Sequence, residues 1–176
     1  MRKIYPYCFH KTYQIIKRIK WILPLLCLAI MLGGCPYGSD VPIDNATVKI
    51  DPKLLGKWET KSSSEKYYVV TKKDDYHYAI EKKDAKGGDS DFYVAHFNIL
   101  GSDRFLNIKE AADDAKTYYF YKLELSSTGV KATLIPVTEN IDETFTTLAE
   151  LKAYFEKYRT LSFFFDKTED VYIKIE

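Results

Sequence analysis

The chain has few cysteines, and none lies beyond residue 35. The three cysteines are Cys8, Cys27 and Cys35. The rest of the chain therefore has no disulfide, cysteine nucleophile, CxxC redox pair or cysteine-ligated zinc. Histidine is also scarce there, because only His77 and His96 follow Cys35, and their spacing matches no metal-ligand motif. We expect no metal and no other cofactor.

The sequence also lacks an apolar run long enough to cross a membrane as a helix. Its longest apolar stretch, residues 21–32, contains Pro24 and falls short of the roughly 20 residues that a bilayer requires. Residues 1–20 before it carry six basic and no acidic side chains, and two glycines and Cys35 follow it. A basic segment, a short apolar run and small residues are the parts of an export signal.

A surplus of basic charge is missing once this segment is set aside. The whole chain has 26 Lys and Arg against 25 Asp and Glu, but six of the basic residues lie within residues 1–20. The remainder has 20 basic and 25 acidic residues, a net charge of −5. Nucleic-acid binding needs a concentrated basic face, so we expect no nucleic-acid partner.

Common catalytic motifs are missing as well. The sequence has no G-x-S-x-G nucleophile turn and no glycine-rich phosphate loop. The acidic pairs Asp74-Asp75 and Asp113-Asp114 lie in predicted turns, and neighbouring strand residues point to opposite faces, so neither pair presents converging carboxylates. We expect no catalytic residues and no enzymatic activity.

Short strands separated by turn residues are present throughout the second part of the chain. Consecutive strands at such short spacing favour an antiparallel meander, and closure into a barrel removes its exposed edges. We predict a mainly β fold, a lipocalin-like barrel of roughly eight or nine strands whose interior holds side chains or one small ligand. The predicted strands are residues 55–61, 66–73, 76–83, 91–100, 104–109, 117–125, 130–137, 161–165 and 171–175.

One segment, residues 146–158, departs from the strand pattern. Leu148, Leu151 and Phe155 recur at spacings of three and four, which indicates a helix with one apolar face. Thr147 followed three residues later by Glu150 forms a capping box. The sequence therefore predicts one helix in the C-terminal half.

The segment ending in Gly33-Gly34-Cys35 resembles a bacterial lipobox, the motif read by lipoprotein diacylglyceryl transferase and signal peptidase II. The resemblance implies a signal peptide of residues 1–34, cleavage between Gly34 and Cys35, and lipid attachment at Cys35 with fatty acyl chains such as palmitate. The partner would then be a membrane of the bacterial cell envelope. Pro36, in place of aspartate, favours the outer membrane if the organism is Gram-negative. The alternative is an ordinary signal followed by an unmodified Cys35.

This boundary divides the remaining chain into two parts. Residues 35–53 contain three prolines and little periodicity, so we expect a lipidated tether. Residues 54–176 would be the folded domain. Its start, Gly56-Lys57-Trp58, resembles the Gly-x-Trp motif of lipocalins and other calycins. The resemblance implies that Gly56 allows a sharp start to the first strand and that Trp58 plugs the closed end of the barrel.

A second resemblance covers more of the domain. Residues 92–101 and 104–108 look like a recurring pattern in uncharacterised bacterial lipocalin-like lipoproteins, as does the segment around Glu150 and Phe155. The chain departs from lipocalins in having no disulfide, and Lys174 is its only late-strand candidate for a basic residue stacked on the tryptophan.

Four tyrosines form the one suggestive set of side chains. Tyr76 and Tyr78 alternate, as do Tyr119 and Tyr121, and alternate residues of a strand share a face. In a barrel they are candidates to line an apolar cavity with a few hydroxyl groups. The alternative is ordinary aromatic packing.

Two functions follow from this interpretation. The first is a membrane-anchored, non-enzymatic lipocalin-like lipoprotein that binds a small apolar or aromatic ligand. The second is a structural or accessory lipoprotein with a filled barrel, whose surface binds another envelope protein. The volume of the barrel interior distinguishes them.

Overall fold

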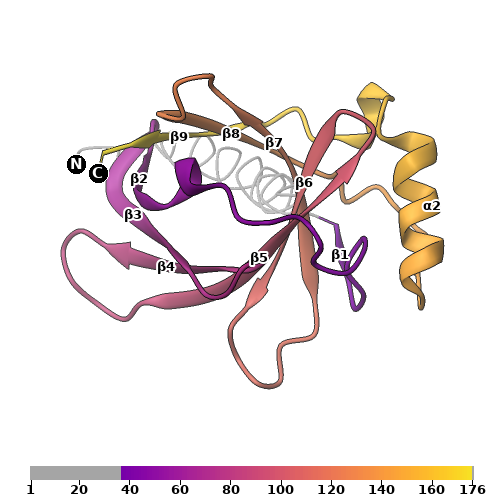
Figure 1. Ribbon diagram of the computed structural model, residues 1–176, viewed down its shortest axis with the longest axis horizontal. Coiled ribbons are helices and arrows are strands. Elements are labelled where there is room, and N and C mark those ends of the chain that lie inside the picture. The colour runs from indigo at the N-terminus through magenta and orange to yellow at the C-terminus, as the bar shows by residue number, and fades with distance from the viewer. Residues whose placement is uncertain (1–36, 176) are drawn as a thin grey trace, which may run out of the picture. The chain divides into compact units, whose positions relative to one another are not determined.

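Residues 37–175 are described by the computed structural model, shown in Figure 1. The predicted signal segment and Cys35 lie outside the described residues. The chain from Pro36 onward forms one compact unit. Its strands are β1 (Gly38–Ser39), β2 (Gly56–Thr60), β3 (Ser63–Lys72), β4 (Tyr78–Asp84), β5 (Asp91–Leu100), β6 (Asp103–Glu110), β7 (Tyr118–Leu125), β8 (Lys131–Pro136) and β9 (Asp170–Lys174).

Strands β2 to β9 close into an antiparallel barrel. Each strand from β2 to β8 pairs with the next, and β9 fits between β8 and β2. Closure is made by the registers Trp58↔Lys174 and Ala132↔Tyr172. The ring leaves none of these eight strands as a free edge. The predicted fold class is confirmed: an eight-stranded barrel, one extra strand β1, and one α-helix in the C-terminal half of the described chain.

The helix α2 (Leu148–Tyr158) covers one side of the barrel and supports a second core outside it (Figure 1). Both bonds of the Thr147–Glu150 capping box form, so the predicted helix is confirmed with a start two residues later. The ring of Phe155 meets Phe105 and Phe120, with centroids 5.4 and 5.3 Å away. The buried residues of this outer core are Tyr37, Ile43, Leu100, Phe105, Phe120, Val137, Ile141, Leu151, Phe155 and Phe164.

A different set of side chains packs inside the barrel. They come from alternate positions of the strands, as the pleat of a sheet requires. The short 3₁₀ helix η1 (Pro52–Leu54) adds one of them. Both cores lie within the compact unit Pro36–Glu176. The buried inner residues are Leu54, Trp58, Tyr78, Ala95, Phe97, Leu106, Leu123 and Ala132.

The described part of the predicted tether, residues 37–53, is folded onto the barrel; we call it the strap. Gly38 pairs with Tyr119 of β7, and Ile43 is fully buried in the outer core. The Ile43 amide donates to Asn107 Oδ1 at 2.8 Å. The structure thus differs from the expected tether, because apolar side chains spaced among prolines find partners on the barrel rather than in water.

Polar side chains on the outside of β5 and β6 hold the strap. His96 Nε2 donates to the carbonyl of Asp44 at 3.0 Å, and Asn98 Nδ2 donates to that of Asn45, also at 3.0 Å. Asn107 joins them by donating to Asn98 Oδ1 at 2.9 Å. These three buried polar residues therefore replace the main-chain partners that a neighbouring strand would supply.

The predicted strand at residues 161–165 is wrong in type. Residues Ser162–Phe164 form a 3₁₀ helix, η2. This turn places Phe164 in the outer core, with 1% of its surface exposed, and leaves Phe163 66% exposed. A run of aromatic residues favours a strand locally, but burial against α2 decides the conformation.

Candidate functional site

A cavity of about 250 Å³ lies inside the barrel. Every one of the eight barrel strands contributes to its wall, and η1 adds Leu54. The wall is mostly apolar, with six tyrosines and one lysine among its residues. They are Leu54, Trp58, Tyr68, Val70, Tyr78, Ile80, Lys82, Tyr93, Phe97, Leu106, Ile108, Tyr119, Tyr121, Leu123, Ala132, Leu134 and Tyr172.

The cavity floor is built around Trp58, which is 3% exposed. The indole Nε1 donates to the carbonyl of Leu54 at 2.9 Å, so the ring is fixed against η1. Lys174 Nζ lies 5.8 Å from the centre of the Trp58 ring and donates to the carbonyl of Lys53. Gly56 has φ of 124°, a conformation that glycine adopts readily, where η1 turns into β2. The glycine, the tryptophan and the basic residue thus lie together at the floor.

Polar groups at the floor already form hydrogen bonds and ion pairs with other residues of the protein. The Tyr78 hydroxyl accepts the amide of Asp51 at 2.6 Å, and its ring meets Phe97 edge to face at 5.6 Å. Arg104 lies over the Phe97 ring and pairs with Asp51 at 3.3 Å. This end of the cavity therefore offers a ligand mainly apolar surface, while the polar groups named here already contact the protein.

The other five tyrosines line the cavity from beside Trp58, which Tyr68 faces across β2 and β3, to the opposite end. Tyr68 and Tyr172 pack edge to face with centroids 5.3 Å apart. Burial raises the pKa of Tyr121 to about 12, so its phenol stays protonated at neutral pH. Tyr119 is 36% exposed, which marks this end as the mouth. These five wall tyrosines are Tyr68, Tyr93, Tyr119, Tyr121 and Tyr172.

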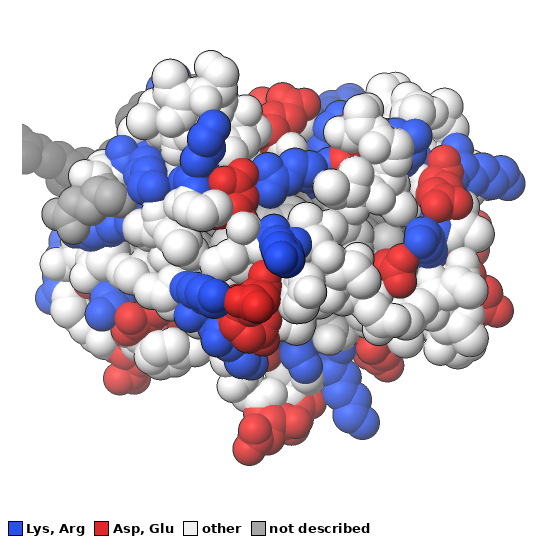
Figure 2. Space-filling model, in the orientation of Figure 1, with Lys and Arg blue, Asp and Glu red and all other residues white. Residues whose placement is uncertain are grey.

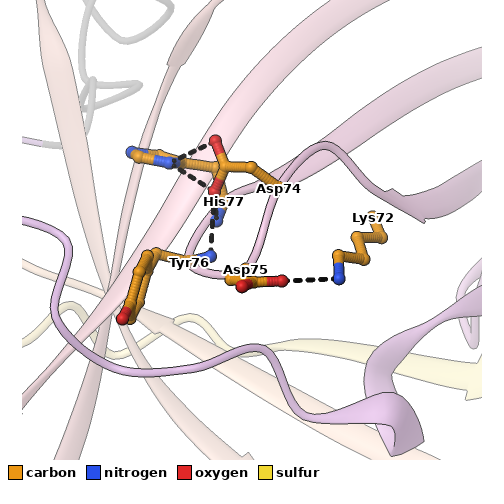
Figure 3. Close-up of polar contacts among 5 residues, drawn as sticks. All are labelled: Lys72, Asp74, Asp75, Tyr76 and His77. Carbon is orange, nitrogen blue, oxygen red and sulfur yellow. Dashed lines mark hydrogen bonds and ion pairs between the residues drawn. The ribbon is translucent and has the colours of Figure 1, made fainter.

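Three of the four tyrosines singled out from the sequence lie in the cavity wall: Tyr78, Tyr119 and Tyr121. Tyr76 does not, because it lies in the turn between β3 and β4 and is 38% exposed (Figure 3). There the Asp74 carboxylate accepts the amides of Tyr76 and His77, both at 2.8 Å. This turn delays the start of β4 to Tyr78, so the alternation that grouped Tyr76 with Tyr78 does not extend through it.

Four lining residues with polar groups escaped the sequence analysis: Tyr68, Lys82, Tyr93 and Tyr172. None of the four has a residue of its own type two positions away, so no alternating pair drew attention to it. Register supplies the missing signal, since Tyr68 lies directly opposite Lys82 across β3 and β4. Alternate residues of β4 from Tyr78 to Lys82 share the face that lines the cavity. The register then shows which residues of the neighbouring strands lie on that face.

The two histidines have structural partners. The His77 ring lies against Asp74, with Nδ1 2.9 Å from a carboxylate oxygen (Figure 3). The ring centroids of His77 and His96 are 5.6 Å apart. Burial lowers the pKa of His96, which keeps that ring neutral above mildly acidic pH. Among residues 37–175, no three His, Cys, Asp or Glu side chains gather as metal ligands would.

The surface gives no single-sign charged region on the face shown in Figure 2, where basic and acidic side chains are interspersed. In the described part of the chain, no helix combines the length and the apolar character needed to cross a bilayer. Comparisons of the chain with models of protein families, with curated proteins and with solved structures gave no match.

Proposed function

We propose that the protein is a non-enzymatic, lipocalin-like lipoprotein that binds one small apolar or aromatic molecule inside its barrel. The observation that carries this proposal is the cavity of about 250 Å³ with its mostly apolar wall. The alternative function, a protein-binding module with a filled barrel, predicts a solid interior, and the cavity argues against it.

The size of the cavity limits the ligand. A cavity of about 150 Å³ holds benzene, so about 250 Å³ accommodates on the order of ten non-hydrogen atoms. A single ring with a short substituent meets this limit, whereas a long acyl chain exceeds it. From the usual binding energy per atom of small ligands, we expect Kd values on the order of tens of micromolar.

Attachment to the membrane through Cys35 is the second part of the proposal. Its support is the lipobox resemblance, which favours the cell envelope and, in a Gram-negative organism, the outer membrane. Only Pro36 separates Cys35 from Tyr37, which is buried in the outer core. The anchor would therefore lead directly into the fold rather than into a free linker.

Metabolic labelling tests the anchor. A fatty acid added to the growing cells should label the wild-type protein and not Cys35→Ala, because the thioether requires the thiol. Two or three acyl chains give stable membrane attachment, so only the wild type should sediment with membranes. Equal labelling of both proteins would refute the anchor.

Filling the cavity tests ligand binding. Ala132 lines the cavity on β8, and its neighbour Lys131 is exposed on the outer face. We expect Ala132→Leu to weaken the binding of α-methylstyrene at least tenfold in calorimetric titrations, because the added side chain occupies ligand space. Lys131→Leu adds the same side chain outside the barrel and should leave Kd unchanged. Equal affinity of the two variants would exclude the cavity as the binding site.

A further inference from the structure

Hydrogen-bonding groups are distributed unevenly along the cavity. At the floor, the Trp58 indole and the Tyr78 hydroxyl are bound to backbone groups of the strap and η1. At the mouth, the hydroxyls of Tyr93, Tyr119 and Tyr121 make no hydrogen bond with any residue in the described range 37–175. A ligand would therefore meet apolar surface below and free phenol groups above.

These phenol groups are available as donors. Burial raises the pKa of Tyr93 as well as that of Tyr121, so both remain protonated at neutral pH. A protonated phenol has one O–H to donate. A ligand oxygen at this level of the cavity can therefore accept a hydrogen bond from more than one strand.

Charged groups at the mouth disfavour an anionic ligand, and the apolar wall disfavours an ion of either sign. Lys82 is already bound to Asp91, with Nζ 2.8 Å from a carboxylate oxygen. Asp170 lies two residues before Tyr172 on the same face of β9 and acts on the pKa of Tyr121. A carboxylate ligand would face two acidic side chains and compete with Asp91 for Lys82. A cation would be attracted by the same carboxylates, but it would have to give up its hydration to enter the mostly apolar cavity, whose wall offers it only neutral phenol oxygens and Lys82.

We propose that the cavity selects an uncharged ring compound bearing one oxygen acceptor, a carbonyl above all, whose ring rests against Trp58 and whose oxygen is bound by the hydroxyls of Tyr121 and Tyr93. The inference rests on the proposed function, since it names the ligand class of the same cavity. It adds polarity and orientation to a proposal that otherwise specifies only size and apolar character.

Four monosubstituted benzenes of matched size test this selection: acetophenone, α-methylstyrene, benzoate and benzamidinium. They differ in the group attached to the ring, which is a carbonyl, an apolar isostere, an anion or a cation. Calorimetric titrations at neutral pH use residues 36–176, and the full chain repeats the acetophenone and α-methylstyrene titrations. We expect acetophenone to bind more tightly than either ion.

Tyrosine variants test the hydrogen bond by itself, because the hydration of each free ligand is the same for the wild type and the variant. Tyr121→Phe or Tyr93→Phe should weaken acetophenone binding roughly three- to tenfold, the usual loss for one neutral hydrogen bond, and leave α-methylstyrene binding unchanged. Tyr118→Phe is the matched control, since Tyr118 lies on the same strand as Tyr121 but outside the cavity wall. Thermal unfolding of each variant verifies that it is folded.

The outcomes separate this inference from the proposed function. If α-methylstyrene does not bind the wild type, the cavity is no apolar ligand site and both proposals fail. If it binds, but neither tyrosine variant changes the ratio of the two Kd values, the proposed function stands and the selection is refuted. Tighter binding of benzoate or benzamidinium than of acetophenone would also refute it.

Discussion

The strap gives the sharpest test of how the fold is stabilised. Ile43 is fully buried among aromatic side chains of the outer core, and its amide is bound to Asn107. Replacing a buried isoleucine by alanine costs about 2–5 kcal/mol of unfolding free energy. Whole domains have only about 5–15 kcal/mol, so Ile43→Ala should visibly lower the stability.

Removal of the whole strap should cost more. A chain that begins at Leu54, the boundary expected from the sequence, lacks Ile43, Tyr37 and strand β1. Loss of the two buried side chains alone amounts to about 5–10 kcal/mol, which is comparable to the total stability. The groups of His96 and Asn107 would regain hydrogen bonds from water, so they add little to the loss. We expect residues 54–176 to be unfolded or only partly folded at 25 °C.

Urea unfolding followed by circular dichroism and by tryptophan emission measures both effects. Residues 36–176 serve as the reference, because Trp58 is their only tryptophan. Ile99→Ala is the matched control, since Ile99 is 54% exposed and should change the free energy by less than about 0.5 kcal/mol. A truncated protein with the reference midpoint, or a loss at Ile43 below about 1 kcal/mol, would refute the structural role of the strap.

Two further predictions concern single side chains. Trp58→Ala should cost about 3–5 kcal/mol, and the native emission of the wild type should be blue-shifted; emission typical of exposed indole would contradict the position of the ring. The pKa of His96, which faces His77 and Asp44, is lowered by burial, so the unfolded state takes up its proton first on acidification. Stability should therefore fall as the pH drops below the ordinary pKa of 6.5, and His96→Gln should remove this part of the fall. Equal dependence of the unfolding free energy on pH in the wild type and the variant would refute the prediction.

Local patterns were sufficient to predict most of the barrel. Strand β5 was predicted at its observed bounds, because its strand-like run lies between the loop at residues 85–90 and the turn at residues 101–103. The α2 helix was predicted from the spacing of Leu151 and Phe155 and from its capping box, both of which depend on residues within one or two turns. Such features need no knowledge of the rest of the chain.

Features that depend on distant partners were not predicted. The strap has no periodicity, and its burial depends on Asn107, which lies 64 residues away from Ile43 in sequence. The wall of the cavity also depends on closure, since Tyr172 joins Tyr68 only because β9 pairs with β2. The sequence of a single strand does not show which side chains barrel closure will bring together.

The second layer formed by the strap and α2 has a consequence for the motions of the wall. It covers the outside of β5 to β7, where fully buried residues such as Phe105 and Phe120 occur, whereas β3 on the other side has no buried residue (Figure 1). Local opening requires least free energy where few side chains are buried. Amide hydrogens of β3 and β4 should therefore exchange with solvent well before those of β5 and β6. The side of the barrel without the second layer is the part that can open locally when a ligand enters or leaves.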